Sequence, residues 1–184
     1  MIHGRFFNEV FVDEIYKPVR ERGSVGVVLD VGSTTGEFSL WVYPQAKTIY
    51  ALEPASELYP HLRENVKELP KIHPFNLALS DINGDQRFYD DSTSGGGRLA
   101  EGENNRIVKS TTLASFMEEN KIEEIDILKI DIEGGEKAVF NAPDFPWDKI
   151  MFVIGEHLGS LQGLFEGNGF KMDNYQYGFT AERK

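Results

Sequence analysis

The feature that most constrains this chain is a repeating order of apolar strands and helices joined by glycine-containing turns. Residues 25–31, VGVVLDV, form an apolar run with almost no alternation, which is typical of a parallel strand buried on both faces. A glycine turn follows, and then a helix is predicted over 37–43 and a second strand over 48–52. Further parallel strands are predicted at 71–81, 125–131 and 149–157. This alternation predicts a doubly wound, mostly parallel α/β sheet with helices on both faces.

The remaining elements fit one domain over residues 1–184. Helices are predicted at 56–69 and 111–121, antiparallel strands at 82–91 and 105–112, and a terminal hairpin or two short strands at 170–183. Between the antiparallel strands, Gly95 to Gly97 mark a polar loop whose composition suits a substrate lid. Apolar residues recur at helical spacing before the first strand, so residues 1–23 are interpreted as an extension carrying an amphipathic helix: Phe7, Val10, Phe11 and Ile15.

Charge and composition narrow the class of partner. The net charge is −11, which would repel a nucleic-acid backbone, so a small or neutral substrate is expected. The absence of cysteine excludes disulfides and thiolate metal sites and fits the cytoplasm. No apolar run approaches the roughly 18 residues that span a bilayer, so no membrane partner is predicted.

The first glycine turn, DVGSTTG, indicates the cofactor class. The dinucleotide pattern G-x-G-x-x-G fails here because Thr34 and Glu37 replace its second and third glycines. Glu53 stands 21 residues after Gly32, where a carboxylate can accept both ribose hydroxyls of an adenosine. The alternatives are a plain tight turn and a helix-terminal acid. Taken together, the spacing favours S-adenosylmethionine, with its methionine carboxylate at the N–H groups of the turn.

The fourth strand, in DILKIDIEGG, carries polar side chains on one face. Lys129, Asp131 and Glu133 alternate, so they share a side of the strand. If this strand neighbours the first one, both acids overhang the ligand crevice at the switch point of the sheet. Lys129, deep in an apolar strand, needs a carboxylate partner: Asp131, Glu133 or an acid on a neighbouring strand. The alternative for Glu133 is a helix-start acid favoured by the dipole.

The fifth strand ends in Gly155, Glu156 and His157. His157 at this edge is a candidate general base, although a lone histidine is more often structural. Together with Asp131 and Glu133, these residues could hold Mg²⁺, but nothing in the spacing requires it, so no metal is predicted.

Three segments resemble the FkbM-type methyltransferases: LDVGSTTGEFSLW, LALSDINGDQRFY and STTLASFMEENKIEEIDILKIDIEGGEKAVF. The resemblance runs from about Val25 to His157 and implies a class I, Rossmann-like fold with a seven-stranded sheet and an antiparallel last hairpin. It implies methyl transfer from S-adenosylmethionine to a hydroxyl of a sugar or natural product, with Ala78 and Leu79 beside the adenine. Members often carry additional N-terminal helices, whereas about 23 residues precede the first strand here, so a homodimer that completes the pocket is an option.

The full expectation is an S-adenosylmethionine-dependent O-methyltransferase acting on a small-molecule hydroxyl. The residues expected at the cofactor are Asp30, Gly32, Ser33, Thr34, Gly36, Glu53, Pro54, Ala78, Leu79 and Asp131. The residues expected in catalysis are His157, Glu133 and Asp131. Two rivals remain: a non-catalytic adenosine-ligand or protein-binding module on the same fold, and a nicotinamide oxidoreductase that the missing third glycine disfavours.

Overall fold

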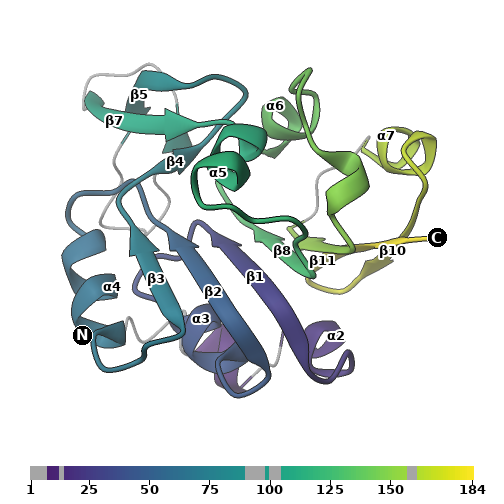
Figure 1. Ribbon diagram of the computed structural model, residues 1–184, viewed down its shortest axis with the longest axis horizontal. Helices are drawn as coiled ribbons and strands as arrows, with labels where there is room; N and C mark the ends of the chain where they lie inside the picture. Colours follow the sequence, from purple (N-terminus) through teal and green to yellow (C-terminus); the bar gives the residue numbers. More distant parts are fainter. Residues whose placement is uncertain (1–7, 13–14, 90–97, 100–104, 157–160) are drawn as a thin grey trace.

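The computed structural model describes residues 8–12, 15–89, 98–99, 105–156 and 161–184. Its main sheet has seven strands in the order β10-β11-β9-β8-β1-β2-β3 (Figure 1). The strands are β1 (Val25–Val31), β2 (Ala46–Leu52), β3 (Ile72–Phe75), β8 (Ile127–Ile130), β9 (Phe152–Gly155), β10 (Phe170–Tyr175) and β11 (Gly178–Arg183). Only the pairs that involve β11 are antiparallel within this sheet. The predicted mostly parallel seven-stranded sheet with a C-terminal hairpin is confirmed.

Strand β1 lies in the interior of the sheet, with β2 on one side and β8 on the other. Val28 and Leu29 have no exposed surface, because the strand is covered on both faces. The chain moves outward from β1 in one direction through β2 and β3, and returns to its other side at β8. The strand order therefore reverses beside the carboxyl end of β1, where open α/β sheets bind their ligands.

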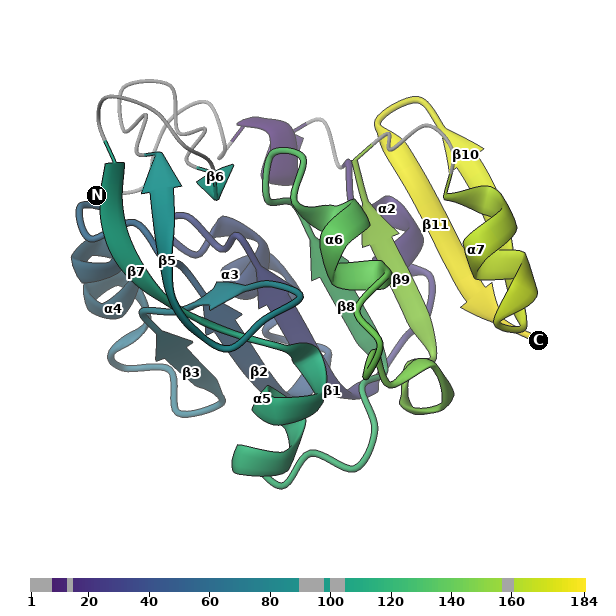
Figure 2. The same ribbon diagram turned by 90° about the horizontal axis from the view of Figure 1, so that it is seen from above.

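Helices cover the two faces of the sheet in separate layers (Figure 2). One apolar cluster joins β1 and β2 to the layer of α2 (Lys17–Arg20), α3 (Glu37–Val42) and α4 (Tyr59–Val66). The other cluster joins the opposite face to α5 (Leu113–Glu119), α6 (Glu136–Phe140) and α7 (Gln162–Gly167). Thr112 is the N-cap of α5, and its hydroxyl accepts a hydrogen bond from the Ser115 amide at 3.2 Å. A single turn, η2 (Trp147–Lys149), precedes β9.

A second, four-stranded sheet is inserted between β3 and α5, in the order β4-β7-β5-β6. Its strands are β4 (Ala78–Leu79), β5 (Gly84–Tyr89), β6 (Arg98–Leu99) and β7 (Asn105–Thr111). The antiparallel β5–β7 pair confirms the two strands expected there. The single strand expected over 71–81 is wrong, because the chain leaves the main sheet after β3. Asn76 marks that exit, since its side-chain amide donates to the Glu53 and Pro54 carbonyls at 2.9 and 3.1 Å.

The described residues before β1 include two short helical pieces rather than one continuous amphipathic helix. They are η1 (Asn8–Val12), a π-helical turn, and α2. Pro18, which lacks an N–H group, falls in the first turn of α2, where proline is tolerated. Of the apolar positions expected to face the domain, Val10 is buried and Phe11 is 36% exposed. Phe7 and the Gly95–Gly97 loop lie outside the described residues.

Within the described part of the chain, no helix has the length and apolar character needed to cross a membrane.

Candidate active site

The turn after β1 is built so tightly that only glycine fits at its first position. Gly32 has φ +71°, and a Cβ there would lie 1.8 Å from the backbone oxygen of Asp131 on the neighbouring β8 turn. The Gly32 and Ser33 amides both donate to the Leu52 carbonyl at 3.0 Å. These two N–H groups therefore connect the turn after β1 to the end of β2. We expected them to donate to a ligand carboxylate, but both are used within the protein.

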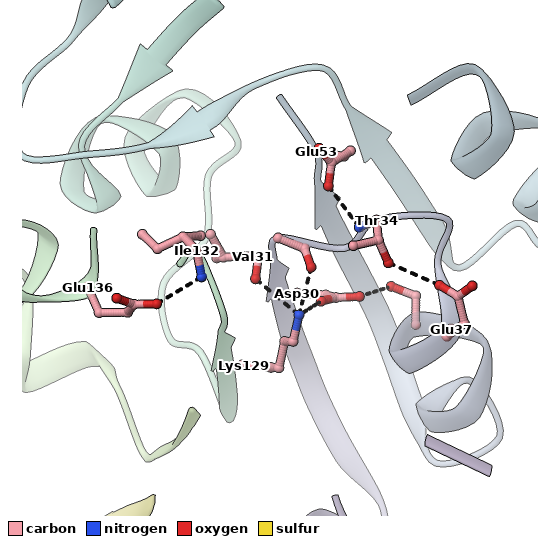
Figure 3. A network of polar contacts seen from close by, with 10 residues as sticks. Asp30, Val31, Thr34, Glu37, Glu53, Lys129, Ile132 and Glu136 are labelled. Carbon is pink, nitrogen blue, oxygen red and sulfur yellow. Dashed lines mark hydrogen bonds and ion pairs between the residues drawn. The ribbon is translucent and has the colours of Figure 1, made fainter. Parts of the chain in front are cut away.

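Beneath the turn lies a buried ion pair between β1 and β8 (Figure 3). The Lys129 ammonium lies 3.2 Å from Asp30 Oδ1 and donates to the carbonyls of Val31 and Gly32 at 3.2 and 2.8 Å. Ser39 donates its hydroxyl to the other Asp30 oxygen at 2.7 Å. Burial is the largest single influence and lowers the pKa of the Lys129 amine, but the acidic groups around it, Asp30 first and then Tyr16 and Asp131, together outweigh burial and raise that pKa. The partner that Lys129 required is thus the acid on the neighbouring strand.

Glu53, at the end of β2, is held against the same turn. Its two carboxylate oxygens accept the Thr34 and Ala55 amides, each at 2.8 Å. Burial raises the pKa of Glu53 to about 7, although these two hydrogen bonds pull it down. Each oxygen keeps a lone pair for a further donor, so Glu53 can still accept hydroxyl groups at the edge of the sheet.

A cavity opens between the N-terminal segment and the carboxyl ends of β1, β8 and β9. Its described lining is Val10, Ile15, Tyr16, Gly32, Ser33, Thr34, Glu37, Phe38, Lys129, Asp131, Gly155, Glu156, Tyr175 and Tyr177. Ser33 is 2% exposed, and its hydroxyl makes no hydrogen bond. A buried hydroxyl without a partner is costly, which indicates that a polar ligand group belongs beside it.

Two carboxylates at this cavity come from adjacent strands, Asp131 after β8 and Glu156 after β9. The charge of Asp131, then partial burial, then the charge of Glu133 raise the pKa of Glu156 to about 7. Glu136 closes the β8–α6 turn by accepting the Ile132 and Gly134 amides at 2.8 and 3.0 Å. Glu136 is therefore the helix-start acid, and Glu133, at φ +57°, stands in the turn before it.

The structure brings part of the predicted set together at the cavity: Gly32, Ser33, Thr34 and Asp131. Asp30 and Glu53 are next to these residues but not in the cavity lining: Asp30 pairs with Lys129, and Glu53 accepts the Thr34 amide. Gly36 lies against Leu62 of α4. Pro54 directly follows Glu53 and does not line the cavity.

Two further predicted residues, Ala78 and Leu79, are buried in β4 and do not line the cavity either. Their role beside an adenine stays a prediction. His157 lies outside the described residues. Among the residues that the structure describes, no three histidine, aspartate or glutamate side chains are grouped to hold a metal ion.

Sequence reasoning missed the aromatic side of the cavity. Tyr16 is buried against Phe38, with ring centroids 4.7 Å apart, and Tyr175 and Tyr177 face each other at 6.3 Å. Tyr175 ends β10 and Tyr177 lies in the turn before β11, so strand alternation does not relate their side chains, and no local pattern places them at the end of β9.

Comparison with known proteins places the chain in a family. Residues 30–174 match the methyltransferase FkbM domain. The 31-O-demethyl-FK506 methyltransferase FkbM of Streptomyces tacrolimicus is 28% identical, over 89% of this chain and 80% of its own length.

Two solved structures share the fold at low identity. The methyltransferase FkbM of Methylobacillus flagellatus is 10% identical with a TM-score of 0.58, over 96% of this chain and 47% of that one. TrmK of M. capricolum, solved with S-adenosylhomocysteine, is 12% identical with a TM-score of 0.51, over 98% of this chain and 66% of that one. The chain belongs to the FkbM methyltransferase family and has the class I methyltransferase fold.

Proposed function

We propose that this member of the FkbM methyltransferase family binds S-adenosylmethionine at the carboxyl end of β1 and methylates a hydroxyl group of a small molecule. The observation that carries the proposal is the buried, unpartnered hydroxyl of Ser33, in a cavity whose turn is bonded to Glu53 through Thr34. The name of the Streptomyces relative, a methyltransferase of a demethylated oxygen, supports oxygen as the acceptor atom.

The residues present suit the parts of this cofactor. Ser33 would donate its hydroxyl to the methionine carboxylate, and Glu53 would accept the ribose hydroxyls with its remaining lone pairs. Gly32, which cannot carry a Cβ, lets the β1 turn pack against the Asp131 backbone, so that the turn and Asp131 lie side by side at the proposed methionine end. Ala78 and Leu79 are proposed to border the adenine. Bound there, the cofactor supplies an activated methyl group on a positively charged sulfur.

The chain itself aligns the acceptor and takes its proton. Asp131 lies at the cavity wall, where its carboxylate can accept a hydrogen bond from an acceptor hydroxyl. Glu133 and His157 remain proposed partners in that proton transfer. Tyr16 of the N-terminal segment and Phe38 of α3 line the cavity with apolar rings, which would limit the access of water to the bound cofactor.

Calorimetric titration with S-adenosylmethionine tests the cofactor site. Wild-type protein should bind at micromolar concentration, and Glu53→Ala should weaken binding by at least tenfold because the ribose loses its acceptor. The control is Glu64→Ala, since Glu64 is an exposed acid on α4 paired with Lys67. A folded wild-type protein that gives no heat of binding would overturn the proposal.

Turnover is measured next, as S-adenosylhomocysteine released in the presence of a panel of hydroxylated sugars and polyketides. The expected homodimer stays a prediction that light scattering after size-exclusion chromatography would check.

A further inference from the structure

The residue that precedes α2 brings a tyrosine into the cavity at the end of β1. Tyr16 lines this cavity, although it belongs to the segment before the sheet. Its ring packs on two rings of α3, with centroids 4.7 Å from Phe38 and 6.5 Å from Trp41. The Tyr16 carbonyl also accepts the Val19 amide at 2.9 Å, and the residue is only 8% exposed. Packing therefore holds the Tyr16 side chain in one place.

The Tyr16 hydroxyl remains protonated. Burial is the main influence on the pKa of this phenol and raises it well above its usual range. The next influence is the positive charge of Lys129, which lowers the pKa, ahead of Asp131 and Asp30, which raise it. The phenol therefore keeps its proton and can donate a hydrogen bond.

This hydroxyl lies at the same end of the cavity as the turn after β1. Lys129, the charge that acts on it most strongly, donates to the Gly32 carbonyl at 2.8 Å. Ser33 follows Gly32, lines the same cavity and is 2% exposed. In the described part of the chain, neither the Ser33 nor the Tyr16 hydroxyl has a hydrogen-bond partner. Buried hydroxyls without partners are costly, so a polar ligand group is expected beside them.

The charge around the two hydroxyls favours an anionic ligand group. The Lys129 ammonium contacts three protein oxygens, so its N–H groups are already used. Its positive charge still acts on the Tyr16 hydroxyl more strongly than any single acid does. An anion that accepted both hydroxyl protons would also be attracted by this charge. The carboxylate in the methionine part of the proposed cofactor is such a group.

We propose that Tyr16 is a cofactor-binding residue whose hydroxyl donates to the same carboxylate of S-adenosylmethionine as the Ser33 hydroxyl. This inference rests on the proposed cofactor site and extends it to the segment before β1. A carboxylate has two oxygens, so it can accept one hydrogen bond from each hydroxyl. Hydrogen bonds to a charged group are stronger than those between neutral groups, so the loss of either hydroxyl should be measurable in binding.

Calorimetric titration with four ligands tests the assignment. S-adenosylmethionine and S-adenosylhomocysteine carry the carboxylate, decarboxylated S-adenosylmethionine lacks only that group, and 5′-methylthioadenosine lacks the whole amino-acid part. Tyr16→Phe removes the hydroxyl and keeps the ring that packs on Phe38. This variant should bind the two carboxylate-bearing ligands about tenfold more weakly than wild-type protein does, and the other two within about twofold of wild type.

Two further variants complete the experiment. Ser33→Ala should reproduce the pattern of Tyr16→Phe, because it removes the other donor. Tyr43→Phe is the control and should change the affinity of none of the four ligands, since Tyr43 packs against the same apolar cluster as Tyr16 but is not part of the described cavity lining. Unchanged binding of 5′-methylthioadenosine also shows that each variant is folded.

An equal loss of all four ligands in Tyr16→Phe, or no loss of any, would overturn the role of this hydroxyl while the cofactor site stands. A loss of decarboxylated S-adenosylmethionine as large as that of S-adenosylmethionine would overturn the carboxylate as the partner. Failure of all four ligands to bind folded wild-type protein would instead overturn the cofactor site itself.

Discussion

The buried Lys129–Asp30 pair should be the most sensitive point of the sheet. The two charged atoms lie 3.2 Å apart, and the side chains are 4% and 0% exposed. At an effective dielectric constant of 20 their attraction is about 5 kcal/mol before desolvation is subtracted. Lys129→Met keeps the length of the side chain but leaves the Asp30 carboxylate buried without its counter-charge. We expect the free energy of unfolding to fall by about 3–5 kcal/mol.

A double-mutant cycle separates charge pairing from packing. Asp30→Asn alone leaves the ammonium buried and unpaired, so it should also be costly, whereas Lys129→Met with Asp30→Asn leaves no unpaired charge. The double variant should be more stable than the sum of the two single losses predicts, by at least about 2 kcal/mol. Urea unfolding followed by circular dichroism, extrapolated to water, gives the four free energies.

The surface pair Lys67–Glu64 is the matched control. Its nitrogen–oxygen distance is 2.6 Å, shorter than that of the buried pair, but the side chains are 54% and 66% exposed. Lys67→Met should therefore leave the free energy of unfolding unchanged within error. Additive losses in the Lys129–Asp30 cycle, or a loss below about 1 kcal/mol for Lys129→Met, would refute the reasoning that burial makes this pair matter.

Two further predictions concern the glycine turn and its acid. Gly32→Ala should lower the free energy of unfolding by several kcal/mol, because the added Cβ would lie 1.8 Å from the Asp131 backbone oxygen. Gly134→Ala is the control, since Gly134 also has a positive φ, +104°, but a Cβ there would have no atom within 4 Å. In the same urea assay Gly134→Ala should lower the free energy of unfolding by only about 1 kcal/mol. The pKa of Glu53 is about 7 in the folded protein, against an unperturbed value of 4.5. Between these two pH values the folded state binds a proton that the unfolded state has lost. The free energy of unfolding therefore falls as the pH rises from about 4.5 to about 7. Glu53→Gln should gain stability relative to wild type from pH 5 to pH 8, by at most about 3 kcal/mol, and a difference independent of pH would contradict the shift.

The main sheet could be predicted because the apolar composition of its strands shows that they are buried. The run from Val25 to Val31 is apolar on both faces, and that pattern requires cover on both sides. The exit of the chain at Asn76 could not be predicted in the same way. A two-residue strand such as Ala78–Leu79 has too few positions for a period, and its partner is a strand about thirty residues later.

The candidate site was predictable where spacing along one strand decides it. Lys129 and Asp131 share a face by alternation, and the requirement that Lys129 have a buried carboxylate partner left three options: Asp131, Glu133 or an acid on a neighbouring strand. The use of the turn amides was not predictable, because the Leu52 carbonyl that accepts two of them belongs to the next strand. The raised pKa of Glu156 depends on three acids from other elements, and no local pattern encodes that sum.

The position of β11 has a consequence for how the chain reaches its native state during synthesis. This strand follows all the other described strands in sequence, yet it lies inside the sheet, between β9 and β10. Gly178 and Gly155 allow its start to press against the end of β9, where a Cβ at 178 would lie 2.0 Å from the Gly155 oxygen. Until residues 178–183 emerge from the ribosome, β9 presents an unpaired edge that can join another chain. Nascent or clipped protein without this strand is therefore the form most exposed to aggregation and to quality-control proteases.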